Sequence, residues 1–271
     1  AIWLNVATAS GAPVSTTHSI IGAVLGAGIA AGGAQSANWA TLSGIVASWV
    51  ISPVMGGVVA AGFLYWIKRS ITYQEDMVAA AQRMVPILIG LMAFAFSTYL
   101  ILKGLNKIWK VGVVSAFGIG LALGVATYWL IRRSISRKFE LLDNSKASIN
   151  TLFTIPLICA AALLSFAHGA NDVANAVGPL AAIVDTAKHA GGEISAKASI
   201  PLWVMLVGAT GIAIGLLLYG PRLIRTVGSE ITELDQMRAF CIAMSAALTV
   251  IIASQLGLPV SSTHIAVGGV F

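Results

Sequence analysis

One polar stretch, residues 165–180, interrupts an otherwise apolar run, and its polar residues recur at helical spacing. They are Ser165, His168, Asn171, Asp172 and Asn175. At this spacing they share one face of a helix, opposite apolar or small residues. A polar stripe on a membrane helix must face protein or water, because lipid leaves its groups without hydrogen-bond partners. The stripe therefore indicates a binding surface, and we expect Gly178 and Pro179 to end its helix.

A second polar pattern occurs twice. Residues 11–24, GAPVSTTHSIIGAV, align without gaps on residues 257–270, GLPVSSTHIAVGGV, with eight of fourteen positions identical. In each copy the proline precedes a serine, Ser15 or Ser261, that can cap the next helix. A helix N-terminus presents free N–H groups and a partial positive charge, which bind anions. Two such ends that converge within a membrane would make an oxyanion site of backbone amides and hydroxyls.

Asp172 lies well inside a predicted membrane segment, where we expect no lysine or arginine. A carboxylate in the membrane is costly and by default functional, but alone it would repel an anion. The combination makes sense if Asp172, with Asn171 and Asn175, holds a cation that travels with the anion. Na⁺ suits carboxylate, amide and carbonyl oxygens. A proton on Asp172 is the alternative.

Other polar residues have a structural reading beside the functional one. Each of His18, His168 and His264 could anchor a helix end or act as a ligand, and the structural role is favoured. Gln255 could make a helix-end hydrogen bond or contact the ligand. A Ser, a His and Asp172 also suggest an intramembrane serine hydrolase. No G-x-S-x-G elbow surrounds either capping serine, however, and a duplicated motif favours a two-fold transport site over one nucleophile.

The composition is that of an integral, multi-pass membrane protein in contact with lipid. Hydrophobic residues make up 58% of the 271, charged residues make up 10%, and the mean hydropathy is +0.89. A soluble domain has about 25% charged residues. The net charge of +6 does not predict a nucleic-acid partner, because the lysines and arginines are confined to short loops that orient membrane spans.

These features predict an all-α fold in a single transmembrane domain, residues 1–271. We expect a first broken helix at 1–33, three spans within 39–131, a cytoplasmic loop at 132–150, second-repeat spans within 151–238, and a second, truncated broken helix at 239–271. The charged linker 68–83 is expected to form a short interfacial helix. If both broken helices are re-entrant hairpins, the repeats have inverted topology, and if both cross fully, the repeats are parallel. Loops 67–84, 132–150 and 221–238 carry eleven of the sixteen basic residues, which places them in the cytoplasm.

The segment HGANDVANA, residues 168–176, together with the duplicated P-V-S-x-T-H, resembles the inorganic phosphate transporter (PiT) family over nearly the whole chain. The resemblance implies symport of phosphate with Na⁺ or H⁺ across the plasma or inner membrane, an inverted-repeat fold with two re-entrant hairpins, and a homodimer. It places Asn171, Asp172 and Asn175 in the cation and phosphate site. The implied hairpin contacts to phosphate are Ser15, Thr16, Thr17, Ser261, Ser262 and Thr263.

Two further expectations follow from the resemblance. The family carries a G-A-N-D-type motif in each half, and the first-half copy would lie before residue 1. We therefore expect a partial chain that does not transport on its own. Hydroxyls and amides recognise the tetrahedral shape of an anion rather than its charge. The alternative to a phosphate symporter is therefore a symporter of another oxyanion such as sulfate.

Overall fold

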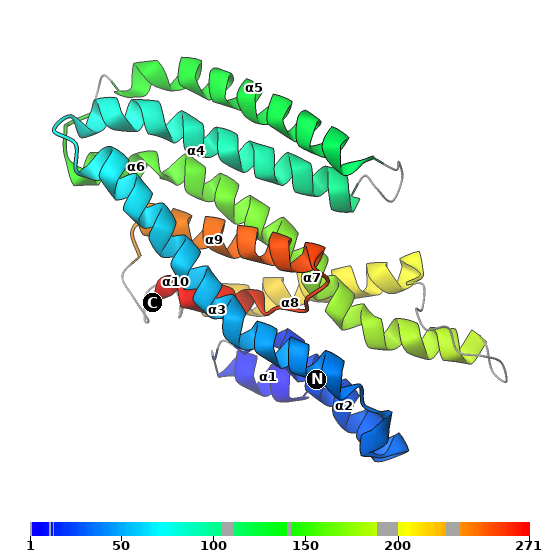
Figure 1. The fold of residues 1–271 in the computed structure, drawn as a ribbon. Coiled ribbons are helices and arrows are strands. Elements are labelled where there is room, and N and C mark those ends of the chain that lie inside the picture. Colours follow the sequence, from blue (N-terminus) through cyan, green and yellow to red (C-terminus); the bar gives the residue numbers. More distant parts are fainter. Residues whose placement is uncertain are drawn as a thin grey trace.

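The computed structural model describes residues 2–10, 12, 14–104, 111–139, 142–188, 200–225 and 234–271. In these ranges the chain consists of helices and the turns between them (Figure 1). The α-helices are α1 (Ile2–Ala9), α2 (Thr16–Gly32), α3 (Trp39–Ile67), α4 (Met77–Tyr99), α5 (Val113–Phe139), α6 (Lys146–Leu152), α7 (Thr154–Lys188), α8 (Leu202–Arg225), α9 (Gln236–Gln255) and α10 (Ser262–Val270). The all-α fold expected from the sequence is confirmed.

Six of the described helices are long and apolar enough to cross a membrane. These segments are Trp39–Thr72, Met77–Leu102, Val113–Ser134, Thr154–Lys188, Leu202–Pro221 and Gln236–Gln255. A hydrocarbon core about 30 Å thick needs about 20 residues of helix. The two copies of the duplicated motif lie at the starts of α2 and α10, each of which follows another helix, α1 or α9.

Polar side chains fix where several helices begin. At each of these starts the cap accepts a hydrogen bond from the backbone N–H three residues later, which would otherwise lack a partner. The caps are Ser15, Asn38, Asp76, Ser145, Asp235 and Ser261. The prediction that Ser15 and Ser261 are N-caps is therefore confirmed.

The core lies where α3, α4, α7 and α9 meet. Its fully buried large side chains include Ile67, Leu88, Phe153, Phe240 and Met244. Helix α5 packs along α4 at one edge of the molecule, and α1 and α2 lie at the opposite edge (Figure 1). Helices α7, α9 and α10 lie between these edges. The polar stripe on α7 therefore lies close to the copy of the duplicated motif at the start of α10.

Helices α3 and α10 cross with their backbones in contact. A Cβ atom added to Gly268 would lie 2.2 Å from the carbonyl oxygen of Pro53, and one added to Gly56 would lie 2.5 Å from that of Ile265. Only glycine permits such an approach, and small residues at crossings are typical of membrane helices. This crossing holds α10 against α3.

Three expectations about element boundaries were wrong. Gly178 and Pro179 do not end their helix, because α7 continues to Lys188. Neighbouring helices in a membrane can compensate for the hydrogen bond that a proline removes, and Val177 is packed tightly against Gly208 of α8 at this point. Residues 68–83 form a π-turn, Lys68–Thr72, and the start of α4 instead of an interfacial helix. The expected loop 132–150 contains the end of α5 and the start of α6.

Candidate functional site

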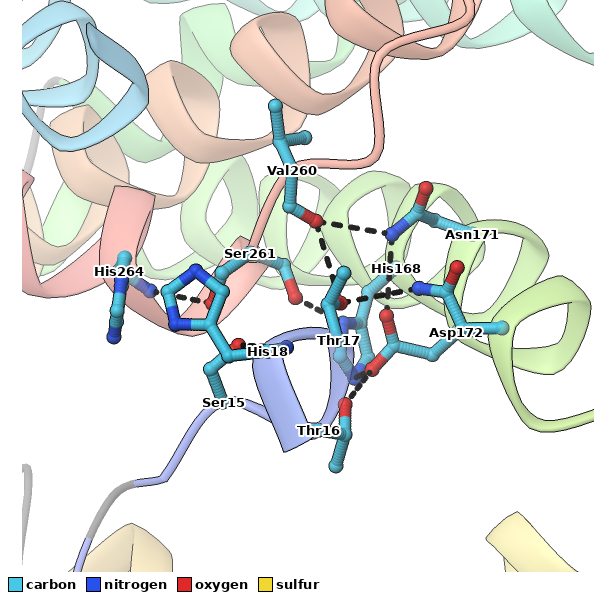
Figure 2. Close-up of polar contacts among 12 residues, drawn as sticks. Ser15, Thr16, Thr17, His18, His168, Asn171, Asp172, Val260, Ser261 and His264 are labelled. Atoms are coloured by element: carbon cyan, nitrogen blue, oxygen red, sulfur yellow. Dashed lines mark hydrogen bonds and ion pairs between the residues drawn. The ribbon is translucent and has the colours of Figure 1, made fainter. Parts of the chain in front are cut away.

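The two capped helix starts lie side by side (Figure 2). The hydroxyl oxygen of Ser15 accepts a hydrogen bond from the backbone N–H of His18, and that of Ser261 accepts one from His264, both at 3.2 Å. The imidazole rings of His18 and His264, which occupy equivalent positions of the duplicated motif, have centroids 4.5 Å apart. The N-termini of α2 and α10 therefore converge, as the duplicated motif predicts.

Asp172 lies at this convergence, on α7, with only 9% of its surface exposed. Its Oδ2 atom accepts a hydrogen bond from Thr16 Oγ1 at 3.1 Å and lies 3.4 Å from His168 Nε2. Its Oδ1 atom accepts one from Asn171 Nδ2 at 3.2 Å. A buried carboxylate is stable only when its oxygens are hydrogen-bonded or paired with charge, and Asp172 meets that condition through α2 and its own helix.

The backbone before α10 takes part in the same network. The carbonyl oxygen of Val260 accepts hydrogen bonds from Asn171 Nδ2 at 3.4 Å and from Thr17 Oγ1 at 3.5 Å. Asn175 Nδ2 donates to Thr17 Oγ1 at 3.1 Å. Three segments that are far apart in the sequence, at residues 16–17, 171–175 and 260, are thereby joined in one polar cluster (Figure 2).

His168 connects the start of α10 to the carboxylate of Asp172. Its Nδ1 atom lies 2.5 Å from the hydroxyl oxygen of Ser262, while Nε2 faces Asp172 four residues along α7. Sequence reasoning favoured a helix-anchoring role for this histidine, and the structure places it inside the polar network. The signal was present in the spacing, because residues four apart on a helix face each other.

The structure brings together most of the predicted site residues but not all of them. Thr16, Thr17, Ser262, Asn171, Asp172 and Asn175 share the network, and Ser15 and Ser261 support it as caps. Thr263 is half-buried in the first turn of α10, beside this network. Gln255 is exposed at the end of α9. The carbonyl of Val260 was missed, because its participation depends on how the extended backbone crosses α7.

A cavity opens next to the two asparagines. It measures about 280 Å³ and is lined by Tyr99, Asn171, Asn175, Ser254 and the turn at Gly257 that follows α9, among others. Carboxylate, amide, hydroxyl and carbonyl oxygens are the groups that a hard cation prefers, and the hydroxyls and free amides of two helix N-termini suit an oxyanion. The described site therefore carries both sets of groups within one cluster.

Long apolar helices around a buried polar cluster at the starts of α2 and α10 define the chain as a multi-pass membrane protein of the transporter type. The model of the phosphate transporter family matches residues 1–271. The chain belongs to the phosphate transporter family.

Individual relatives agree with the family match. A Helicobacter pylori (strain J99) protein named "Putative phosphate permease" is 59% identical over the whole chain. A Pyrococcus abyssi protein, also named a putative phosphate permease, is 39% identical over 99% of it. The chain spans 51% of the Helicobacter protein and 65% of the Pyrococcus protein. A solved structure named "The sodium-dependent phosphate transporter" superposes on this chain with a TM-score of 0.90 at 35% identity. The superposition covers 99% of this chain and 66% of the solved chain.

Proposed function

We propose that this chain is part of a secondary active transporter that carries inorganic phosphate across a membrane together with Na⁺. The observation that carries the proposal is the meeting of two serine-capped helix N-termini at a buried carboxylate, Asp172. The names of the relatives support phosphate as the substrate, and the name of the similar structure supports Na⁺ as the coupling ion. The intramembrane hydrolase is not retained, because the family is one of transporters.

Phosphate would be held by the hairpin starts. The hydroxyls of Thr16, Thr17 and Ser262 already converge within hydrogen-bond reach of the α7 stripe. The backbone amides after Ser15 and Ser261 add donors and a partial positive charge. These groups can bind a tetrahedral oxyanion without any lysine or arginine, and Thr263, Asn171 and Gln255 would complete the contacts if the hairpins rearrange.

Na⁺ would be held beside the phosphate by Asp172, with the side-chain oxygens of Asn171 and Asn175. The carbonyl of Val260, which faces Asn171, supplies a further oxygen. A carboxylate and an anion in one low-dielectric site repel each other, so phosphate binds well only after a cation has neutralised Asp172. This electrostatic dependence of the anion on the cation is the physical basis of coupling.

We further propose that the two broken helices are re-entrant hairpins of an inverted repeat, in a homodimeric transporter. The equivalent histidines His18 and His264 face each other between the two repeats, which fits a two-fold relation of the motifs. Alternating access would then move one hairpin relative to the other around a fixed site.

Uptake of labelled phosphate into proteoliposomes tests the proposal. Because the chain spans about half of its curated relatives, the assay uses a chain of the relatives' length that contains these residues. We expect a Na⁺ gradient to drive uptake and excess sulfate to compete weakly. Uptake that is unchanged without Na⁺ but driven by a pH gradient would replace Na⁺ by a proton on Asp172, and stronger uptake of sulfate than of phosphate would overturn the substrate.

A further inference from the structure

The end of α3 and the starts of α4, α6 and α9 lie at one end of the bundle (Figure 1). A basic cavity lies among them. It measures about 240 Å³. Three basic side chains from three different elements line it: Lys68 at the start of the π-turn, Lys146 in the first turn of α6, and Arg238 in the first turn of α9. Asp235 is the acidic residue among its lining, so the lining carries two net positive charges.

The walls of this cavity are fixed by hydrogen bonds between its elements. Asn150 of α6 accepts a hydrogen bond from the backbone N–H of Met237 at 3.0 Å and donates to the side chain of Gln236, which ties α6 to the first turn of α9. Asn144, just before α6, accepts one from the N–H of Met77 at 2.9 Å and donates to the carbonyl oxygen of Glu75 at 2.8 Å. The basic side chains therefore project from a connected frame, not from independent loops.

The cavity also contains a buried hydroxyl that lacks a partner. Thr72 Oγ1 is inaccessible to solvent and has no hydrogen bond within the described residues, although it belongs to the lining. A buried polar group without a partner destabilises the folded chain, so such groups usually bond to an ion, a water or a ligand. A bound phosphodiester would counter the neighbouring positive charges, and rotation of the Thr72 side chain toward it would give this hydroxyl a partner.

The position of the cavity specifies the kind of anion. Its neighbour is a largely apolar groove between α3, α9 and the end of α10 that shares Leu64, Lys68 and Arg238 with it. Ala61 of α3, Ile242 of α9 and residues 269–271 also line this groove. The basic loops of this end are those that the charge bias places in the cytoplasm. An anionic phospholipid matches this arrangement, because its negatively charged headgroup would fit the basic cavity and its acyl chain would fit the neighbouring apolar groove.

We propose that Lys68, Lys146, Arg238 and Thr72 form a binding site for the headgroup of an anionic phospholipid of the cytoplasmic leaflet, with an acyl chain against α3 and α9. The site is separate from the polar cluster around Asp172. Its occupant would tie the ends of α3, α6 and α9 together, at the end of the bundle that carries the second hairpin.

Native mass spectrometry of the purified chain tests the proposal, with phosphatidylglycerol and phosphatidylcholine of identical acyl chains as probes. We expect preferential binding of phosphatidylglycerol, and Lys68→Gln or Arg238→Gln should each weaken it about fivefold, the effect expected for one basic residue near a membrane surface. Arg69→Gln is the matched control, since Arg69 is exposed next to Lys68 and lies outside the cavity lining. Lys68→Arg should retain binding, which separates loss of charge from loss of folding.

Three results would overturn the proposal. Equal binding of the two lipids would show that the site does not distinguish an anionic headgroup from a zwitterionic one. A loss in Arg69→Gln as large as in Lys68→Gln would show a general surface effect. Displacement of the bound phosphatidylglycerol by millimolar inorganic phosphate would show that the cavity takes the free anion instead of a lipid.

Discussion

Gly268 and Gly22 occupy equivalent positions of the duplicated motif, but the structure predicts opposite results when each is replaced by alanine. A Cβ atom at Gly268 would lie 2.2 Å from the carbonyl oxygen of Pro53 and within 2.9 Å of two further backbone atoms of the same residue. A Cβ atom at Gly22 would meet nothing within 4 Å. The same chemical change is therefore a clash in the second repeat and an addition into open space in the first.

The magnitude follows from the contact. Helices α3 and α10 would have to separate by about 1 Å to restore ordinary contact, and because both partners are backbone, no side chain can rotate away. Overpacking of this kind costs about 1–3 kcal/mol, and we place Gly268→Ala at the upper end. Gly22→Ala should instead stabilise α2 by up to about 1 kcal/mol, the difference in helix propensity between alanine and glycine.

Thermal unfolding of the two variants in the same detergent measures the difference. For a chain of this size about 1 kcal/mol corresponds to about 2–4 °C. We therefore expect Gly268→Ala to lower the Tm by roughly 6–12 °C and Gly22→Ala to leave it unchanged or raise it slightly. Gly268→Ala should also weaken phosphate binding, because α10 carries Ser262 to His168. Equal losses in both variants, or none at Gly268, would refute the close crossing of α3 and α10.

Three further substitutions test other parts of the structure. Ser262→Ala should weaken phosphate affinity roughly three- to tenfold without unfolding the chain. The change removes a hydroxyl that also partners His168, and a hydrogen bond is worth about 1 kcal/mol. Unchanged affinity in a phosphate titration would remove Ser262 from the site. Ser245→Ala should destabilise the chain by about 1 kcal/mol, because the buried hydroxyl donates to the carbonyl oxygen of Gly56, and a melting temperature equal to wild type would contradict that contact. Asn150→Ala should lower the free energy of unfolding by about 2 kcal/mol, because it removes two hydrogen bonds between α6 and α9. Amide hydrogen exchange that is no faster at the start of α9 than in the wild type would contradict this connection.

The features that sequence predicted best are those set by local chemistry. Ser15 and Ser261 cap their helices because the cap and its N–H partner are three residues apart. The membrane spans follow from long uncharged runs. The grouping of Asn171, Asp172 and Asn175 on one face follows from the helical period alone.

Features that depend on contacts between distant segments were missed. A local rule ends a helix at Gly178–Pro179, but in the structure α7 continues past them and packs against α8. His168 pairs with Ser262, ninety-four residues away, and the Val260 carbonyl reaches α7 only through the path of the backbone before α10. No single stretch of sequence contains that geometry.

Replacement of Asp172 by asparagine tests the central proposal most directly. Asparagine keeps the shape of the side chain and removes the negative charge that would hold the cation. We predict that Asp172→Asn abolishes Na⁺-dependent phosphate uptake in a chain of the relatives' length, while the melting temperature shows that the protein remains folded. Asp185→Asn, the same change near the end of α7, is the matched control and should keep the Na⁺ dependence. Normal Na⁺-dependent uptake by Asp172→Asn would contradict the role proposed for this carboxylate.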